Sequence, residues 1–127
     1  MKKIISTTNA PAAIGPYSQG TAGAGLVFVS GQLPINPENE QFASNEIEGQ
    51  TKQSLKNLQE ILKASGSSFD NVLKTTVYLK SMDDFAAMNK VYSDFFKEGS
   101  YPARSAVEVG RLPKDALVEI EAIALLD

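Results

Sequence analysis

The sequence predicts a two-layer α+β domain in which two amphipathic helices cover one face of a β-sheet. Apolar residues recur at helical spacing in two separate stretches, residues 45–66 and 81–99. The segments before, between and after these stretches are short runs of β-branched and aromatic residues, which are typical of strands. A chain of 127 residues is long enough for one core and too short for two, so residues 1–127 are expected to form a single domain.

The first helical stretch has a start signal, an apolar stripe and a stop signal. Asn45 and Glu48 resemble a capping box, and Gly66 is the expected end of the helix. The stripe consists of Ile47, Thr51, Leu55, Leu58, Ile61 and Leu62. This spacing predicts a helix with one buried face.

The second helical stretch has the same three features. Ser81 and Asp84 form a cap signal at its start, and Gly99 is expected to end it. Its apolar stripe consists of Phe85, Met88, Tyr92, Phe95 and Phe96. We therefore expect a second helix that packs on the same sheet.

Strands are expected at residues 4–5, 26–30, 72–79, 104–109 and 117–125. Residues 20–25 contain three glycines and predict a tight hairpin turn, whereas residues 34–43 predict a polar surface loop. Within residues 72–79, alternation predicts one common face for a set of four residues. These are Leu73, Thr75, Val77 and Leu79.

The last strand presents two different faces. Val118, Ile120, Ala122 and Ala124 are small or branched and suit a face that packs against helices. The opposite face mixes apolar residues with Glu119 and Glu121. A half-apolar sheet face without helices is typical of an interaction surface. We expect this face to pack against other subunits, with its polar residues lining clefts between them.

The composition excludes several kinds of chemistry. The chain has no histidine and no cysteine, so a Ser/His/Asp triad, a thiolate nucleophile and a disulfide are impossible. No metal site is expected, because zinc sites rarely consist of carboxylates alone. The net charge is −3 and the lysines are scattered, which argues against binding to nucleic acid or to an anionic membrane.

The chain shows no targeting signal. Lys2 and Lys3 resemble the start of a signal peptide, but only two apolar residues follow them. No segment has the length of a membrane span. The expected location is therefore the cytoplasm.

Arg104 is the first candidate site residue. It is one of only two arginines in the chain and begins an apolar strand just after Pro102. A guanidinium can hold a carboxylate by two parallel hydrogen bonds, whereas the simpler interpretation is a surface arginine paired with a nearby acid. The pattern does not decide between the two. Arg104, Ala106 and Glu108 are expected to share one strand face.

Glu119 and Glu121 lie within an otherwise apolar strand. Partial burial would raise the pKa of such a carboxyl toward values that suit general acid–base catalysis. Alternatively, both carboxylates are solvated at a sheet edge or paired with lysine. The pattern by itself favours this second interpretation.

Three further polar side chains stand in notable places. Tyr17 follows a Gly-Pro pair, Asn89 lies beside the apolar stripe of the second helix, and Ser30 precedes Gly31 at the end of a buried strand. A glycine at such a position allows the backbone to approach a ligand closely. For each of the three side chains, a structural hydrogen bond is the simpler explanation.

With these residues in view, the chain is identified as a member of the RidA branch of the Rid family, the reactive intermediate deaminases, also called the YjgF family. The resemblance rests on several stretches in the right order rather than on one motif. They are residues 9–20, 30–34, 102–105, 107–115 and 118–122. Together they extend from near the start of the chain to near its end.

The resemblance implies a chorismate-mutase-like α+β fold with a mixed sheet, assembled as a homotrimer with active sites in clefts between subunits. It implies hydrolysis of 2-imino acids or their enamines, such as 2-iminobutanoate and 2-iminopropanoate, to 2-keto acids and ammonia. Amino-acid dehydratases release such species. No cofactor and no metal are required.

The resemblance also implies roles for individual residues. Arg104 would anchor the substrate carboxylate, and Glu119 would position the attacking water. Further contacts to substrate would come from Tyr17, Ser30, Gly31, Asn89 and Ala106. The family commonly has cysteine where this chain has Ala106, which excludes thiol-based behaviour there but keeps the backbone N–H that would contact the ligand.

Two alternatives remain at this point. A chorismate mutase binds a dianion, and two arginines offer little for two carboxylates and a developing ether charge. A regulator or chaperone-like protein that binds a carboxylate without turnover would have the same Arg104. Glu119 discriminates between such a regulator and a hydrolase. A carboxylate sensor should keep its function in Glu119→Gln, whereas a hydrolase should keep binding and lose rate.

Overall fold

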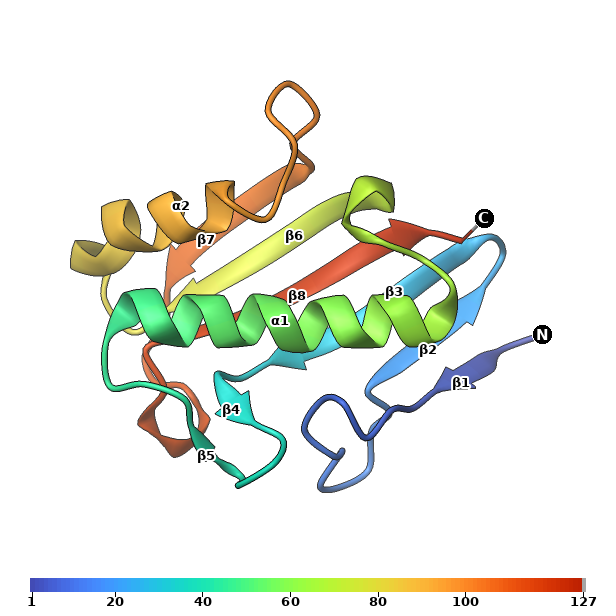
Figure 1. Ribbon diagram of the computed structural model, residues 1–127, viewed down its shortest axis with the longest axis horizontal. Helices are drawn as coiled ribbons and strands as arrows, with labels where there is room; N and C mark the ends of the chain where they lie inside the picture. The colour runs from blue at the N-terminus through green and yellow to red at the C-terminus, as the bar shows by residue number, and fades with distance from the viewer. Residues whose placement is uncertain (127) are drawn as a thin grey trace.

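Six strands form one mixed sheet in the computed structural model, which describes residues 1–126 (Figure 1). Their order is β1-β2-β3-β8-β6-β7. The strands are β1 (Lys3–Ile5), β2 (Gly20–Gly23), β3 (Leu26–Gln32), β6 (Val72–Leu79), β7 (Ala103–Glu108) and β8 (Val118–Leu125). All neighbours are antiparallel except β6 and β7, which are parallel. The parallel pair requires a crossover, and the second helix provides it.

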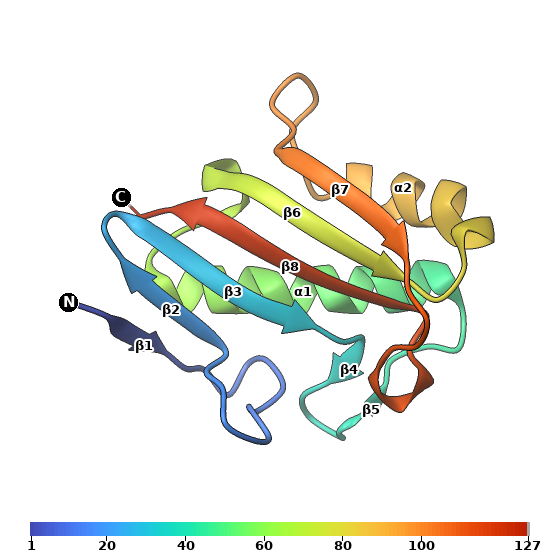
Figure 2. The ribbon, with the colours of Figure 1, turned by 180° about the vertical axis from the view of Figure 1, so that it is seen from behind.

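Both helices, α1 (Ile47–Ser65) and α2 (Phe85–Ser93), lie on the same face of the sheet. Seen from behind, the other face carries no helix (Figure 2). The two-layer α+β architecture predicted from the sequence is therefore confirmed. Short 3₁₀ turns, η1 (Phe69–Asn71), η2 (Met82–Asp84) and η3 (Pro113–Asp115), complete the connections.

The helix boundaries are confirmed at one end and corrected at the others. Gly66 ends α1 in the left-handed conformation, at φ 88°, as expected. The capping box predicted for Asn45 is wrong, because Glu46 is the N-cap residue and no side chain caps the helix. Ser81 accepts a hydrogen bond from the N–H of Asp83 and so caps the 3₁₀ turn η2 that precedes α2. The predicted end of the second helix near Gly99 is wrong, because α2 ends at Ser93.

Three strand-level predictions are also corrected. The turn predicted over residues 20–25 is confined to Ala24 and Gly25, and residues 20–23 form β2. The loop predicted for residues 34–43 contains a small hairpin of β4 (Ile35–Asn36) and β5 (Gln41–Phe42). Leu73 is exposed and Val72 is buried in its place, because a bulge shifts the register of β6 against β8.

The core lies between the helices and the covered face of the sheet. Leu55, Leu58, Ile61 and Leu62 of α1 have no exposed surface. Each such side chain stabilises the fold by about 1.5–3 kcal/mol through burial. On β8 the predicted helix-facing residues are at most 2% exposed: Val118, Ile120, Ala122 and Ala124.

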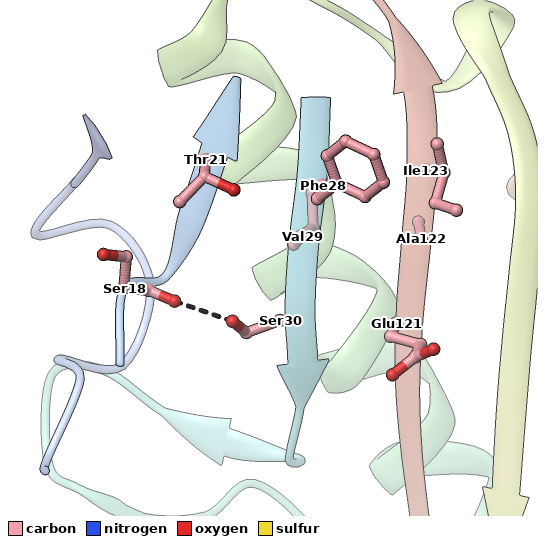
Figure 3. A pocket seen from close by; sticks show the side chains of 8 residues that line it. All are labelled: Ser18, Thr21, Phe28, Val29, Ser30, Glu121, Ala122 and Ile123. Atoms are coloured by element: carbon pink, nitrogen blue, oxygen red, sulfur yellow. Dashed lines mark hydrogen bonds between the residues drawn. The ribbon is translucent and has the colours of Figure 1, made fainter. Parts of the chain in front are cut away.

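The uncovered face of the sheet is partly apolar. Phe28, Val107 and Leu125 are each close to half exposed, and Ile123 lies beside Phe28 (Figure 3). A hollow of about 290 Å³ opens on this face between β2, β3 and β8, and Glu121 lines its polar end. Exposed apolar residues on one face are the feature from which the sequence predicts contacts with other subunits.

Candidate active site

A groove of about 1130 Å³ runs between the N-terminal segment, the end of β3 and the start of β8. Four of the predicted site residues line it together: Tyr17, Ser30, Gly31 and Glu119. Its walls combine apolar residues with many polar ones, among them Glu40 and Lys114, so the groove suits a small polar molecule. The sequence elements that meet here are far apart in the chain.

One buried amide holds the N-terminal wall of this groove. The side chain of Gln19 is 4% exposed and accepts a hydrogen bond from the Thr7 N–H at 2.7 Å. Its Nε2 donates to the carbonyl oxygens of Thr7, Ala10 and Pro11. These bonds satisfy loop carbonyls that no secondary structure would pair, and so fix the segment that ends at Tyr17.

The positions of Ser30 and Tyr17 differ in kind. Ser30 Oγ donates to the carbonyl oxygen of Ser18 at 2.6 Å, so its hydroxyl holds the loop to β3 (Figure 3). The ring of Tyr17 is 53% exposed, and its hydroxyl accepts a long hydrogen bond of 3.4 Å from the Ile14 N–H. The Tyr17 side chain is therefore accessible to a ligand. The Ser30 hydroxyl makes a structural hydrogen bond, which is the simpler of the two roles expected from the sequence.

Gly31 allows the Glu119 carboxylate to lie against the backbone of β3. A Cβ placed on Gly31 would stand 2.7 Å from Cδ of Glu119, closer than real Cβ contacts come. The register of β3 and β8 shifts between Val29 and Gln32, so Gly31 lies in a bulge. Bulges often re-aim side chains beside functional sites, and this one makes room for a carboxylate.

Glu119 has the electrostatic character of an acid–base group. Burial raises the pKa of its carboxyl, and the negative charge of Glu121 raises it further. Within residues 1–126 the single ion pair joins Lys80 and Asp115, so no lysine forms an ion pair with Glu119, although Lys114 lines the same groove. The pairing with lysine that the sequence left open is thus excluded for Glu119.

Arg104 lies in a second cluster, under α2. Its Nη1 donates to Asn89 Oδ1 at 2.6 Å. The guanidinium carbon is 4.8 Å from the ring centroid of Tyr92 and 5.5 Å from that of Phe85. The alternative that Arg104 is an ordinary surface arginine paired with an acid does not hold, because its partners are an amide and two aromatic rings.

The two clusters lie on opposite faces of the sheet. Arg104 is paired with Thr75, whose side chain is buried on the helix side. Glu119 is paired with Tyr78, three residues along the same strand and hence on the uncovered side. Arg104, Asn89 and Ala106 are absent from the lining of the groove. The predicted site residues of one chain therefore form two separate clusters, which we call the two half-sites.

Sequence reasoning assigned Tyr92 and Phe85 only to the apolar stripe of α2 and missed their contact with Arg104. The missing information is that β7 pairs with β6 in parallel, which places Arg104 beneath α2. Gln19 was also missed as the residue that holds the loop. A glutamine between a Gly-Pro turn and a strand is the signal that could have pointed to it.

No metal site or membrane span is found in the described part of the chain. Residues 1–126 contain no group of three or more Asp and Glu side chains arranged to hold a metal ion. None of the helices among these residues is both long enough and apolar enough to cross a membrane.

The fold and the two half-sites define a class: a small α+β domain with a half-buried arginine, which suits a carboxylate ligand, and a separate groove lined by a glutamate without an ion pair. The model of the family described as Endoribonuclease L-PSP matches residues 7–126. The chain belongs to this family, which is the Rid or YjgF family that its sequence resembles.

Relatives match over nearly the whole chain. A RutC family protein of Pyrococcus horikoshii is 54% identical and aligns over 98% of both chains. A 2-iminobutanoate/2-iminopropanoate deaminase of Mus musculus is 50% identical over 98% of this chain and 92% of its own. The crystal structure of Escherichia coli TdcF with bound serine has a TM-score of 0.94 and 45% identity, covering 98% of this chain and 99% of that one.

Proposed function

We propose that this protein is a hydrolase that converts small 2-imino acids, such as 2-iminobutanoate and 2-iminopropanoate, to 2-keto acids and ammonia. The observation that carries the proposal is the Glu119 carboxylate, which is half-buried, forms no ion pair and lies against Gly31 in a groove. A protein that merely binds a carboxylate needs Arg104 but no such base. The imine deaminase among its relatives supports the same reaction.

Arg104 would bind the substrate carboxylate through the N–H groups that its bond to Asn89 leaves free. Asn89 accepts from Arg104 through its oxygen, so its amide N–H₂ group can donate to the same carboxylate. Two-point binding fixes the adjacent C=N carbon relative to the protein. The substrate is thus oriented before any bond changes.

Glu119 would then move the protons. It takes a proton from a water molecule as the water oxygen bonds to the carbon of the protonated imine, which gives a neutral carbinolamine. It returns that proton to the nitrogen, and the C–N bond breaks as the hydroxyl becomes a carbonyl and its proton passes back to Glu119. Release of this proton to ammonia completes the cycle. A carboxyl with a raised pKa suits both directions of transfer.

We further propose that the protein is a homotrimer whose active sites combine the Arg104 half-site of one subunit with the Glu119 groove of its neighbour. Support comes from the opposite faces on which the two half-sites lie and from the exposed apolar residues on the uncovered face of the sheet. The groove is also wider than a four-carbon acid requires, which suits a site that a second chain completes.

The reaction is tested by trapping the imine. A purified threonine dehydratase generates the imine in the presence of semicarbazide, and keto acid is measured with and without this protein. We expect the protein to divert imine from the trapped semicarbazone to free keto acid, in proportion to its concentration. If it does no better than an equal amount of albumin with several amino-acid-derived imines, the hydrolase proposal is wrong.

Sites built from two subunits are tested by mixing inactive variants. Arg104→Ala and Glu119→Gln proteins, each inactive alone, are unfolded together and refolded as mixed trimers. A site is intact where Arg104 of one variant meets Glu119 of the other, so random assembly should restore roughly a quarter of the sites. Native mass spectrometry gives the subunit number, and co-refolding with no recovered activity contradicts shared sites.

The second candidate is a carboxylate-binding regulator without turnover. The observation in its favour is that Arg104 and Asn89 form their half-site without any contribution from Glu119. Such a protein would keep its function in Glu119→Gln, which distinguishes it from a hydrolase. RNA is a poor substrate candidate despite the family description, because the net charge is −3 and the chain has no histidine to act as a base.

A cytoplasmic location of the protein stays an expectation from the sequence.

A further inference from the structure

Two aromatic rings of α2, Phe85 and Tyr92, contact the Arg104 guanidinium of β7. We infer that Tyr92 is a positioning residue, which fixes the plane of Arg104 so that the guanidinium can bind a carboxylate through two hydrogen bonds. The inference rests on the proposed function, because it concerns the same anchor. It adds a residue from the interior of the domain that does not itself touch the substrate.

The Tyr92 ring is held at both ends. Its side chain is 4% exposed, and its hydroxyl shares a hydrogen bond of 2.6 Å with Oγ1 of Thr75, which has no exposed surface. Phe96 packs on the same ring, with centroids 4.6 Å apart. A ring fixed in this way gives a rigid surface on which Arg104 lies at 4.8 Å.

Arg104 needs such a surface. An arginine side chain has many rotamers, and its planar fork matches a carboxylate only in one orientation. The bond from Nη1 to Asn89 fixes one corner of the guanidinium and leaves rotation about that bond. Tyr92 limits this rotation through its ring face, and Phe85 contacts the guanidinium from 5.5 Å. The rings also exclude water from one side, which strengthens hydrogen bonds on the other.

Binding of pyruvate, compared with its neutral amide pyruvamide, reports on this role. The wild-type protein should prefer pyruvate, because only pyruvate carries the charge that Arg104 binds. Tyr92→Leu keeps an apolar side chain in the core but removes the ring. We expect it to reduce the preference for pyruvate about tenfold, within the range of cation–π effects. In turnover, KM should rise more than kcat falls, because the carboxylate is bound in both ground state and transition state.

Two variants separate positioning from general loss of packing. Phe96→Leu removes a ring that packs on Tyr92 but does not contact Arg104, so it should lose less of the preference for pyruvate than Tyr92→Leu does, at equal or greater loss of thermal stability. Tyr92→Phe keeps the ring and loses the bond to Thr75, so it should keep most of the preference. If Tyr92→Leu does not fold, Phe85→Leu provides the test instead. It removes the half-buried second ring that contacts Arg104 and should lower the preference for pyruvate over pyruvamide.

The outcomes are distinct. A wild-type preference that Tyr92→Leu leaves unchanged overturns the inference and leaves the proposed function intact. An equal loss in Phe96→Leu also overturns it, because the effect would then come from the core. A wild-type protein that neither prefers pyruvate nor hydrolyses imines overturns the proposed function together with this inference.

Discussion

Replacing Arg104 with alanine should lower kcat/KM for 2-iminobutanoate by about 10²–10³-fold, equivalent to roughly 3–4 kcal/mol. Arg104 is the only residue of its half-site that carries a positive charge, and its guanidinium is already held by Asn89 and by two rings. Without it the substrate carboxylate enters a partly buried site with no counter-charge. The measurement is steady-state keto-acid formation in the dehydratase-coupled assay.

Two comparisons sharpen this prediction. Arg104→Lys keeps the charge but loses the planar fork and the fit between the rings, so its activity should lie between wild type and Arg104→Ala. Arg111→Ala removes the other arginine of the chain, which is exposed, and should leave kcat/KM close to wild type. Wild-type kcat/KM in Arg104→Ala would show that the carboxylate is bound elsewhere.

Replacing Glu119 with glutamine should lower kcat by about 10²–10⁴-fold while binding of pyruvate stays within a few-fold of wild type. Glutamine has the same size and keeps the contact with Gly31, but cannot accept a proton from water. Pyruvate binding by calorimetry and turnover in the coupled assay give the two quantities. Loss of binding together with rate would mean that Glu119 holds the site together rather than moving protons.

The raised pKa of Glu119 makes this prediction pH-dependent. As the base, Glu119 must be ionised, so kcat of the wild type should fall as the pH drops through its raised pKa. Since Glu121 contributes to the raised pKa, Glu121→Gln should move the midpoint of this fall to lower pH. A pH profile that is flat from neutral pH down to the ordinary pKa range of a glutamate would contradict the assignment.

As the pH rises through the pKa of Glu119, the stability of the fold should fall while the activity should rise. A carboxyl whose folded pKa lies above its unfolded pKa stabilises the fold in its protonated form. This contribution is complete below the unfolded pKa and is lost as the pH rises through the folded pKa. Above the folded pKa the ionised Glu119 destabilises the fold and Glu119→Gln removes this effect, so in that pH range the inactive variant should unfold at a higher urea concentration than wild type.

The alternation of residues 117–125 was sufficient to predict which side of β8 faces the helices, because a strand buried on one side must alternate. The same kind of alternation failed for Leu73 in β6. A bulge between Val72 and Lys74 adds a residue there, so Val72 rather than Leu73 faces the helices. Helix caps were predicted less well than helix stripes. A cap depends on the conformation of one residue, whereas a stripe averages over several turns.

The identities of the candidate site residues came from the sequence and its family resemblance, but their arrangement did not. Local sequence patterns do not indicate that β7 pairs in parallel with β6. The register of this pairing places Arg104 on the α2 side of the sheet, opposite to Glu119. The role inferred for Tyr92 has the same origin. Contacts between elements far apart in the chain depend on strand order, which local patterns do not encode.

The half-site of Arg104 has a consequence for how such an enzyme works under load. Asn89 and Tyr92 hold the guanidinium without any ligand present. If this anchor binds a carboxylate as proposed, it would bind the imino acid and the keto acid alike, because both carry that group and the anchor lies away from the bond that changes. The keto acid would then compete with the imino acid, and its removal by a following reaction would be needed to keep the rate high.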